Sequence, residues 1–111
     1  SYNCDALAIA GATAALADQA WLAQTRAKIL ATRERLTDGM RRLGFDAVPS
    51  QANFTWNTHP EQPVKPMFEE LRRRRILVRY MDYAGWGDGL RISVGTDDEI
   101  EACLAALADI V

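Results

Sequence analysis

The chain has 111 residues, of which 49% are hydrophobic and 25% are charged, and its formal net charge is −2 at pH 7. This length and composition are those of a single ordinary globular domain with one core. The weakly acidic balance argues against a nucleic-acid binder, and no run is long and apolar enough to span a membrane, so we expect neither nucleic acid nor a membrane as a partner.

The two cysteines and the single histidine do not form a metal-ligand spacing. We therefore predict that Cys4 and Cys103 are free, buried thiols in a reducing compartment, with the cytoplasm as the location and a single disulfide as the alternative. The Ala-rich start lacks a basic segment and is a poor signal peptide. Because the chain begins with Ser1 rather than Met, we expect it to be a piece of a longer protein.

Two helices are predicted in the first part of the chain. Residues 5–17 are rich in Ala, which has the best helix propensity, so we expect a helix that packs closely through small side chains. Asp18 suits the N-cap of the next helix and Gly44 suits its end. The apolar residues of this second helix follow one face, namely Leu22, Ile29, Leu36, Met40 and Leu43. This stripe predicts one long helix lying on the core.

Short strands and two more helices are predicted in the rest of the chain. The strands cover residues 45–48, 53–57, 76–80 and 90–94. In the second of these, Phe54 and Trp56 share one face. A third helix follows from Val64, Met67, Phe68 and Leu71, and a last helix begins at the capping-box sequence from Thr96 to Glu99. Residues 81–89, with three glycines, are expected to form a loop.

The order of these elements is α-α-β-β-α-β-β-α. It predicts an α/β (α+β) domain over residues 1–111, in which helices cover one side of a small, mostly antiparallel sheet of three to four strands. No internal repeat or interior linker divides the chain, so we expect one structural unit.

Two arginines of the last two strands are candidate ligands for an anion. Arg91 alternates with Leu90 and Ile92, so it faces the other side of its strand. Arg79 lies in the preceding strand. If the two strands pair antiparallel, both guanidinium groups can emerge on one face, where they would suit a carboxylate, a phosphate or both. The alternative is that each arginine points to solvent or pairs with a local acid.

The remaining polar clusters have simpler explanations. Residues 72–75 (RRRR) are expected to be a solvated helix end. The glycines of residues 85–89 (GWGDG) lead into a strand, which is not the order of a dinucleotide fingerprint, and Trp86 packs there or lines the mouth of a site. His59 has no partner nucleophile and is expected to be an exposed loop residue. The carboxylates of residues 97–101 cap a helix without a metal.

Four segments together resemble one family. Residues 89–96 (GLRISVGT) closely resemble a signature near the C-terminus of histidinol-phosphate aminotransferases, and residues 76–79 (ILVR) resemble a strand of that family, with Arg75 where glycine is common. Residues 50–54 (SQANF) and the start of the chain (YN, then ALA) resemble further segments in the same order. The chain is thus similar to the C-terminal small domain of fold-type I aminotransferases, which depend on pyridoxal phosphate.

The resemblance implies a function and roles for the two arginines. By position, Arg91 would bind the α-carboxylate of the amino donor, glutamate. Arg79 would bind the phosphate of a substrate like histidinol phosphate, in histidine biosynthesis, or the distal carboxylate of glutamate. These small molecules are the implied partners, and a homodimer is the habit of the family. In such enzymes a large domain holds the cofactor and its Schiff-base lysine, and the small domain closes over the substrate.

The cofactor is not expected on this chain. The only lysines, Lys28 and Lys65, do not match the family's lysine motif. We therefore expect pyridoxal phosphate in the full-length protein, none bound to this chain, and no transaminase activity of the chain alone.

Two other kinds of function stay open at this point. Another fold-type I aminotransferase, or a pyridoxal-phosphate-dependent decarboxylase of a phosphorylated amino acid, would keep the Arg91 contact and change the role of Arg79. A non-catalytic α/β module that binds an anion or regulates a partner is an alternative from a different class. An exposed apolar patch would favour the enzyme, because a domain that is missing leaves its docking surface uncovered.

Overall fold

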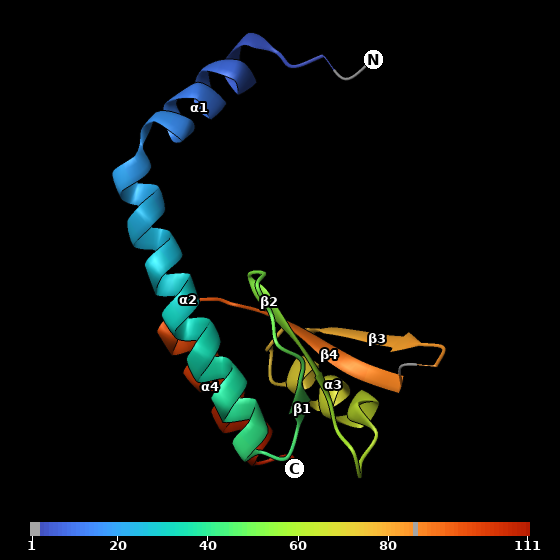
Figure 1. Cartoon of the computed structure of the whole chain (residues 1–111). Helices are drawn as coiled ribbons and strands as arrows, with labels where there is room; N and C mark the ends of the chain where they lie inside the picture. The colour runs from blue at the N-terminus through green and yellow to red at the C-terminus, as the bar shows by residue number, and fades with distance from the viewer. Residues whose placement is uncertain (1–2, 86) are drawn as a thin grey trace.

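The computed structural model describes residues 3–85 and 87–111, so Tyr2 of the family-like start and Trp86 lie outside the described residues. Within them the chain forms four helices and a four-stranded sheet (Figure 1). In chain order these are α1 (Ala6–Ala17), α2 (Gln19–Arg42), β1 (Asp46–Ala47), β2 (Phe54–Thr58), α3 (Val64–Arg73), β3 (Arg79–Tyr83), β4 (Gly87–Ser93) and α4 (Asp97–Ala108). The predicted succession of elements is confirmed.

The sheet is antiparallel throughout, with the spatial order β1-β2-β4-β3. Alternate side chains of β2 and β4, among them Thr55 and Ile92, are buried toward the helices α2, α3 and α4. Asn57 is also buried on this side, where its Nδ2 donates to the carbonyl oxygen of Leu90 at 3.2 Å. A small antiparallel sheet with helices on one side is the predicted fold class, which is therefore confirmed.

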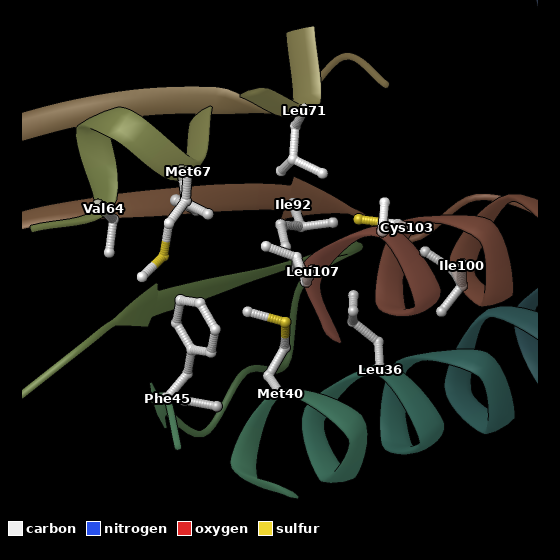
Figure 2. Close-up of a cluster of buried hydrophobic side chains, with 13 residues drawn as sticks. Leu36, Met40, Phe45, Val64, Met67, Leu71, Ile92, Ile100, Cys103 and Leu107 are labelled. Carbon is white, nitrogen blue, oxygen red and sulfur yellow. The ribbon is translucent and has the colours of Figure 1, made fainter. Parts of the chain in front are cut away.

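The core is one cluster of side chains that converge from α2, α3, α4 and β4 (Figure 2). Leu36, Leu71, Leu90 and Leu107 are fully buried, and each comes from a different one of these elements. Removing a leucine side chain from water contributes about 1.5–3 kcal/mol. The burial of Leu90 therefore fixes which face of β4 turns inward and which face stays free.

The N-terminal arm, residues 6–30, projects away from this core (Figure 1). No residue of α1 is buried, and Leu7 and Trp21 are 86% and 63% exposed. The Cα radius of gyration is 17.0 Å, whereas a compact chain of this length has about 13 Å. The predicted helices are confirmed, but the expected close packing of the first is wrong. The apolar stripe of α2 is fully buried only at Leu36 and Met40, because no other part of the described chain covers its first half.

Within residues 3–85 and 87–111, no single helix is long and apolar enough to cross a membrane. The α1–α2 pair, bent by 73°, meets the requirement by length and composition only.

A hairpin of β3 and β4 replaces the loop predicted over residues 81–89. β3 continues to Tyr83 and β4 starts at Gly87, so the connection between the two strands is short. Gly85 and Gly87 have φ values of 82° and 75°, which suit a tight turn. The glycine signal thus marks the turn and not a long loop. The predicted strand over residues 76–80 is displaced toward the C-terminus, since β3 begins at Arg79.

The C-termini of α2 and α3 share one backbone motif. It places Gly44 at a φ of 87° after α2 and Arg75 at a φ of 64° after α3. In both, the N–H of this residue donates to the carbonyl three residues back at 3.0 Å, and the following N–H donates to the carbonyl five residues back, at 3.0 Å after α2 and 2.9 Å after α3. Such a left-handed cap normally selects glycine. Gly44 therefore ends α2 as predicted, whereas Arg75 adopts the same conformation with a side chain.

Candidate functional site

The face of the sheet that turns away from the helices carries the two candidate arginines. Arg79 of β3 lies directly opposite Arg91 of β4 in the antiparallel register. Alternation puts ten residues of β2, β3 and β4 on this open face, namely Phe54, Trp56, Thr58, Arg79, Met81, Tyr83, Gly87, Gly89, Arg91 and Ser93. The predicted geometry, in which both guanidinium groups emerge on one face, is therefore confirmed. That they bind an anion stays a prediction.

The two guanidinium groups have no neutralising acid among the described residues. The ion pairs of residues 3–85 and 87–111 use Arg35, Arg41, Arg73 and Arg74. Asp82 and Asp88 lie opposite each other in the hairpin, but alternation turns them to the other face of the sheet. Like charges directly opposite one another destabilise a strand pair. An anion bound between Arg79 and Arg91 would relieve this repulsion, so the arrangement favours an anion site over a local ion pair.

Aromatic side chains flank Arg91 on the open face. Its Cζ lies 5.2 Å from the centre of the Phe54 ring. Trp56, directly opposite Arg91, packs against Tyr83 with ring centres 5.7 Å apart. The alternation of β2 predicted that Phe54 and Trp56 share a face. It did not predict that the arginines share it too, because the pairing of β2 with β4 joins segments that are distant in sequence.

The arginine run after α3 forms the solvated helix end that was predicted. Residues 72–75 are exposed. Arg73 and Arg74 hold the Glu70 carboxylate at 2.5 and 2.9 Å, and Arg74 also pairs with Asp109 at 2.9 Å. Hydrogen bonds from Arg74 and then from Arg73 hold the pKa of Glu70 below its ordinary value. These positive charges are engaged locally and do not line the open face.

His59 is half-buried rather than exposed, which corrects the expectation from the sequence. Its Nδ1 accepts hydrogen bonds from the backbone N–H groups of Glu61 and Gln62, both at 3.2 Å. Its ring meets that of Phe45 edge to face, with centres 5.0 Å apart. The two Pro residues of this loop indicated a break, but not this contact with the core. His59 organises the loop, and the contacts suit a structural role.

The capping box predicted at the start of α4 is confirmed. Glu99 accepts the backbone N–H of Thr96 at 2.7 Å, and Thr96 Oγ1 accepts the backbone N–H of Glu99 at 3.3 Å, which completes the capping box. Asp97 pairs with Arg35 of α2. Among the residues that the structure describes, no group of three or more His, Cys, Asp or Glu side chains is arranged to hold a metal ion.

Comparison with known sequences decides the family. The family described as aminotransferase class I and II matches residues 1–107. The chain belongs to the class I and II aminotransferases. The resemblance recognised from its motifs is thereby confirmed. The family implies pyridoxal phosphate as the cofactor of the full-length protein.

Relatives of this aminotransferase chain are considerably longer. It is 58% identical over 104 residues to the histidinol-phosphate aminotransferase of Rhodopirellula baltica, which covers 94% of this chain and 29% of the relative. It is 46% identical over 111 residues to that of Acetobacter pasteurianus, with 100% and 31% covered. A crystal structure of a Burkholderia pseudomallei protein assigned as an aminotransferase matches with a TM-score of 0.65 and 35% identity, over 76% of this chain and 26% of that one. The chain thus spans less than a third of the length of these relatives.

The residues of this aminotransferase chain do not by themselves fit pyridoxal phosphate. A Schiff base with the cofactor needs a lysine amine beside the substrate. Lys28 lies exposed on α2 and Lys65 lies exposed on α3, so neither is on the open face. The open face carries the two arginine side chains and several aromatic side chains instead. Its chemistry fits the anionic groups of a substrate.

Proposed function

We propose that residues 1–111 are the C-terminal small domain of a fold-type I aminotransferase and that their open face binds the anionic groups of its substrates. The observation that carries this proposal is the Arg79–Arg91 pair, two directly opposed cations without an acidic partner in the described chain. An arginine fork binds a carboxylate or phosphate through two parallel hydrogen bonds. A substrate with two anionic groups can occupy both forks.

The substrates that we propose are glutamate and a phosphorylated amine like histidinol phosphate. Relatives that are 58% and 46% identical are histidinol-phosphate aminotransferases, which supports this choice. Arg91 would hold the α-carboxylate of glutamate. Arg79, which is more exposed at the edge of the sheet, would hold the phosphate of the amine or the distal carboxylate of glutamate.

Pyridoxal phosphate, when bound by the full-length protein, supplies the electron sink of transamination. We propose that its lysine lies outside residues 1–111 and that the chain alone has no transaminase activity. The positions of Lys28 and Lys65, away from the open face, support this division of labour. The chain's own contribution is to bind and orient the substrate's anions.

The N-terminal arm supports the view that this domain belongs to a larger assembly. Exposed apolar residues follow both of its helices, namely Leu7, Ile9, Leu16, Trp21 and Leu22. An isolated helix of 12 residues, the length of α1, is marginal in water. An exposed apolar surface of this kind usually marks a contact with other protein. We propose that the rest of a cytoplasmic, homodimeric enzyme covers the arm.

Steady-state kinetics of the full-length protein test the proposed roles. A hydrogen bond to a charged group contributes about 1.5–3 kcal/mol, so Arg91→Ala should raise the KM for glutamate about 10- to 100-fold. Arg79→Ala should weaken a phosphorylated amino acceptor more than its unphosphorylated analogue. Arg72→Ala, which removes an exposed arginine from the end of α3, is the matched control. It should change neither the KM for glutamate nor the preference for the phosphorylated acceptor.

The two arginines separate the alternative substrates. Equal weakening of phosphorylated and unphosphorylated acceptors by Arg79→Ala would overturn the phosphate role and favour another aminotransferase or a decarboxylase. An unchanged glutamate KM in Arg91→Ala would overturn the carboxylate site itself.

A further inference from the structure

Arg91 lies over the face of an aromatic ring on the open face of the sheet. Its Cζ lies 5.2 Å from the centre of the Phe54 ring. Phe54 pairs with Ser93 in the register of β2 and β4, and Trp56 pairs with Arg91. The Arg91 side chain therefore leans along its strand toward Phe54, which lies opposite Ser93, and not toward Trp56, which lies directly opposite Arg91. A guanidinium group within about 6 Å of a ring centre is attracted by the negative face of the ring.

The neighbours of Arg91 explain why it leans in this direction. Arg79 stands directly opposite on β3 and repels it. On the β2 side, Trp56 turns its ring over Gly89. A Cβ at Gly89 would lie 2.3 Å from Cζ2 of Trp56, so only glycine leaves room for the indole there. The indole thus leans toward Gly89 and Tyr83, whereas Phe54 lies on the other side of Arg91 along the strand, opposite Ser93.

The contact with Phe54 suits an arginine that must receive an anion. An acidic neighbour would hold the guanidinium through the same N–H donors that an incoming carboxylate needs. An aromatic ring attracts the positive charge without offering a carboxylate oxygen. Among the described residues, no carboxylate forms an ion pair with Arg91. The ring can thus hold the side chain in place while its donors stay available.

We infer that Phe54 is a positioning residue, which holds the guanidinium of Arg91 over its ring for the substrate carboxylate, and that Gly89 makes this possible by accommodating the Trp56 indole. The inference rests on the proposed carboxylate site and goes beyond it, because Phe54 acts through Arg91 and touches no reacting atom. Holding a flexible side chain in its binding geometry raises affinity by reducing the ordering that binding requires.

The test is the affinity of the full-length protein for glutarate, a dicarboxylate that cannot react, measured by isothermal titration calorimetry. Cation–π contacts at half-exposed sites have energies that correspond to about two- to fivefold in affinity. Phe54→Leu should weaken glutarate binding by this factor. Phe54→Tyr keeps the ring face and should bind like the wild type. Phe68→Leu removes an aromatic ring on the helix side of the sheet, away from Arg91, and it should also bind like the wild type.

A double-mutant cycle separates positioning from a general structural effect. If Phe54 acts through Arg91, then Phe54→Leu should cause no further loss of affinity in an Arg91→Ala protein. An equal loss in both backgrounds, or a full loss that Phe54→Tyr does not rescue, would overturn the inference while the carboxylate site stands. If Arg91→Ala alone leaves glutarate binding unchanged, the carboxylate site fails, and the role of Phe54 falls with it.

Discussion

Replacing Arg75 by glycine should stabilise the domain. Arg75 adopts a φ of 64°, in the left-handed region, at the end of α3. A side chain in that conformation costs about 1–2 kcal/mol relative to glycine. The greater freedom of glycine in the unfolded chain offsets about 0.4–1 kcal/mol of this gain. The Arg75 side chain is exposed and has no ion pair among residues 3–85 and 87–111, so little else is lost. The expected net gain is about 0.5–1 kcal/mol.

Thermal and urea unfolding of the purified protein measure this gain. For a domain of this size, it corresponds to a rise in Tm of roughly 2–8 °C. The matched experiment uses the same motif at the end of α2. Gly44→Ala places a side chain at a φ of 87° and should destabilise the protein by about 0.5–1 kcal/mol through the backbone conformation. The short distance of 3.2 Å from its Cβ to Nε2 of His59 should add to this loss.

A substitution inside the helix controls for the intrinsic cost of glycine. Arg72→Gly lies within α3 and should lower stability by up to about 1 kcal/mol. The reasoning predicts opposite signs for Arg72→Gly and Arg75→Gly, three residues apart. A lower Tm for Arg75→Gly, or a neutral Gly44→Ala, would refute it.

Two further predictions concern titratable side chains. At about pH 8, a thiol reagent should modify Cys4 quickly, because Cys4 is exposed and not buried as the sequence suggested. It should modify Cys103 only on unfolding, because burial raises the pKa of Cys103 to about 11; rapid modification of both thiols in the folded protein would contradict this. Hydrogen bonds from the backbone and then the side chain of Thr96 lower the pKa of Glu99 from its ordinary value of 4.5. Its contribution to stability is therefore present above that value and lost as the pH falls through the lower pKa of the folded state. Glu99→Gln should flatten this acid limb in urea unfolding, and an unchanged slope below pH 4.5 would count against the role of the capping box.

The same-face arrangement of the arginines could be predicted because it follows from local geometry. In a strand, the alternation of buried Leu90 and Ile92 dictates where Arg91 points. Antiparallel pairing with the neighbouring strand then brings Arg79 to the same face. The capping box at Thr96 and the C-terminal glycine of α2 were equally local, since each depends on a few adjacent residues.

The surroundings of the arginines could not be predicted because they depend on distant segments. Phe54 and Trp56 reach Arg91 only through the strand order β1-β2-β4-β3, which no local pattern encodes. The role of Gly89 follows from that pairing, so the sequence showed only another loop glycine. The exposure of the N-terminal arm could not be predicted for a different reason. Its apolar pattern is that of a helix that packs, but the surface that it would cover is not part of the described chain.

The central claim is that the open face binds the carboxylate of a substrate through Arg91 beside Arg79. A crystal structure of the full-length protein with glutarate tests it most directly. The account predicts a carboxylate bound by both arms of the Arg91 guanidinium at about 2.7–2.9 Å, with the second anionic group toward Arg79. Glutarate bound away from this face, with Arg91 turned to solvent or paired with an acid from another part of the protein, would contradict it.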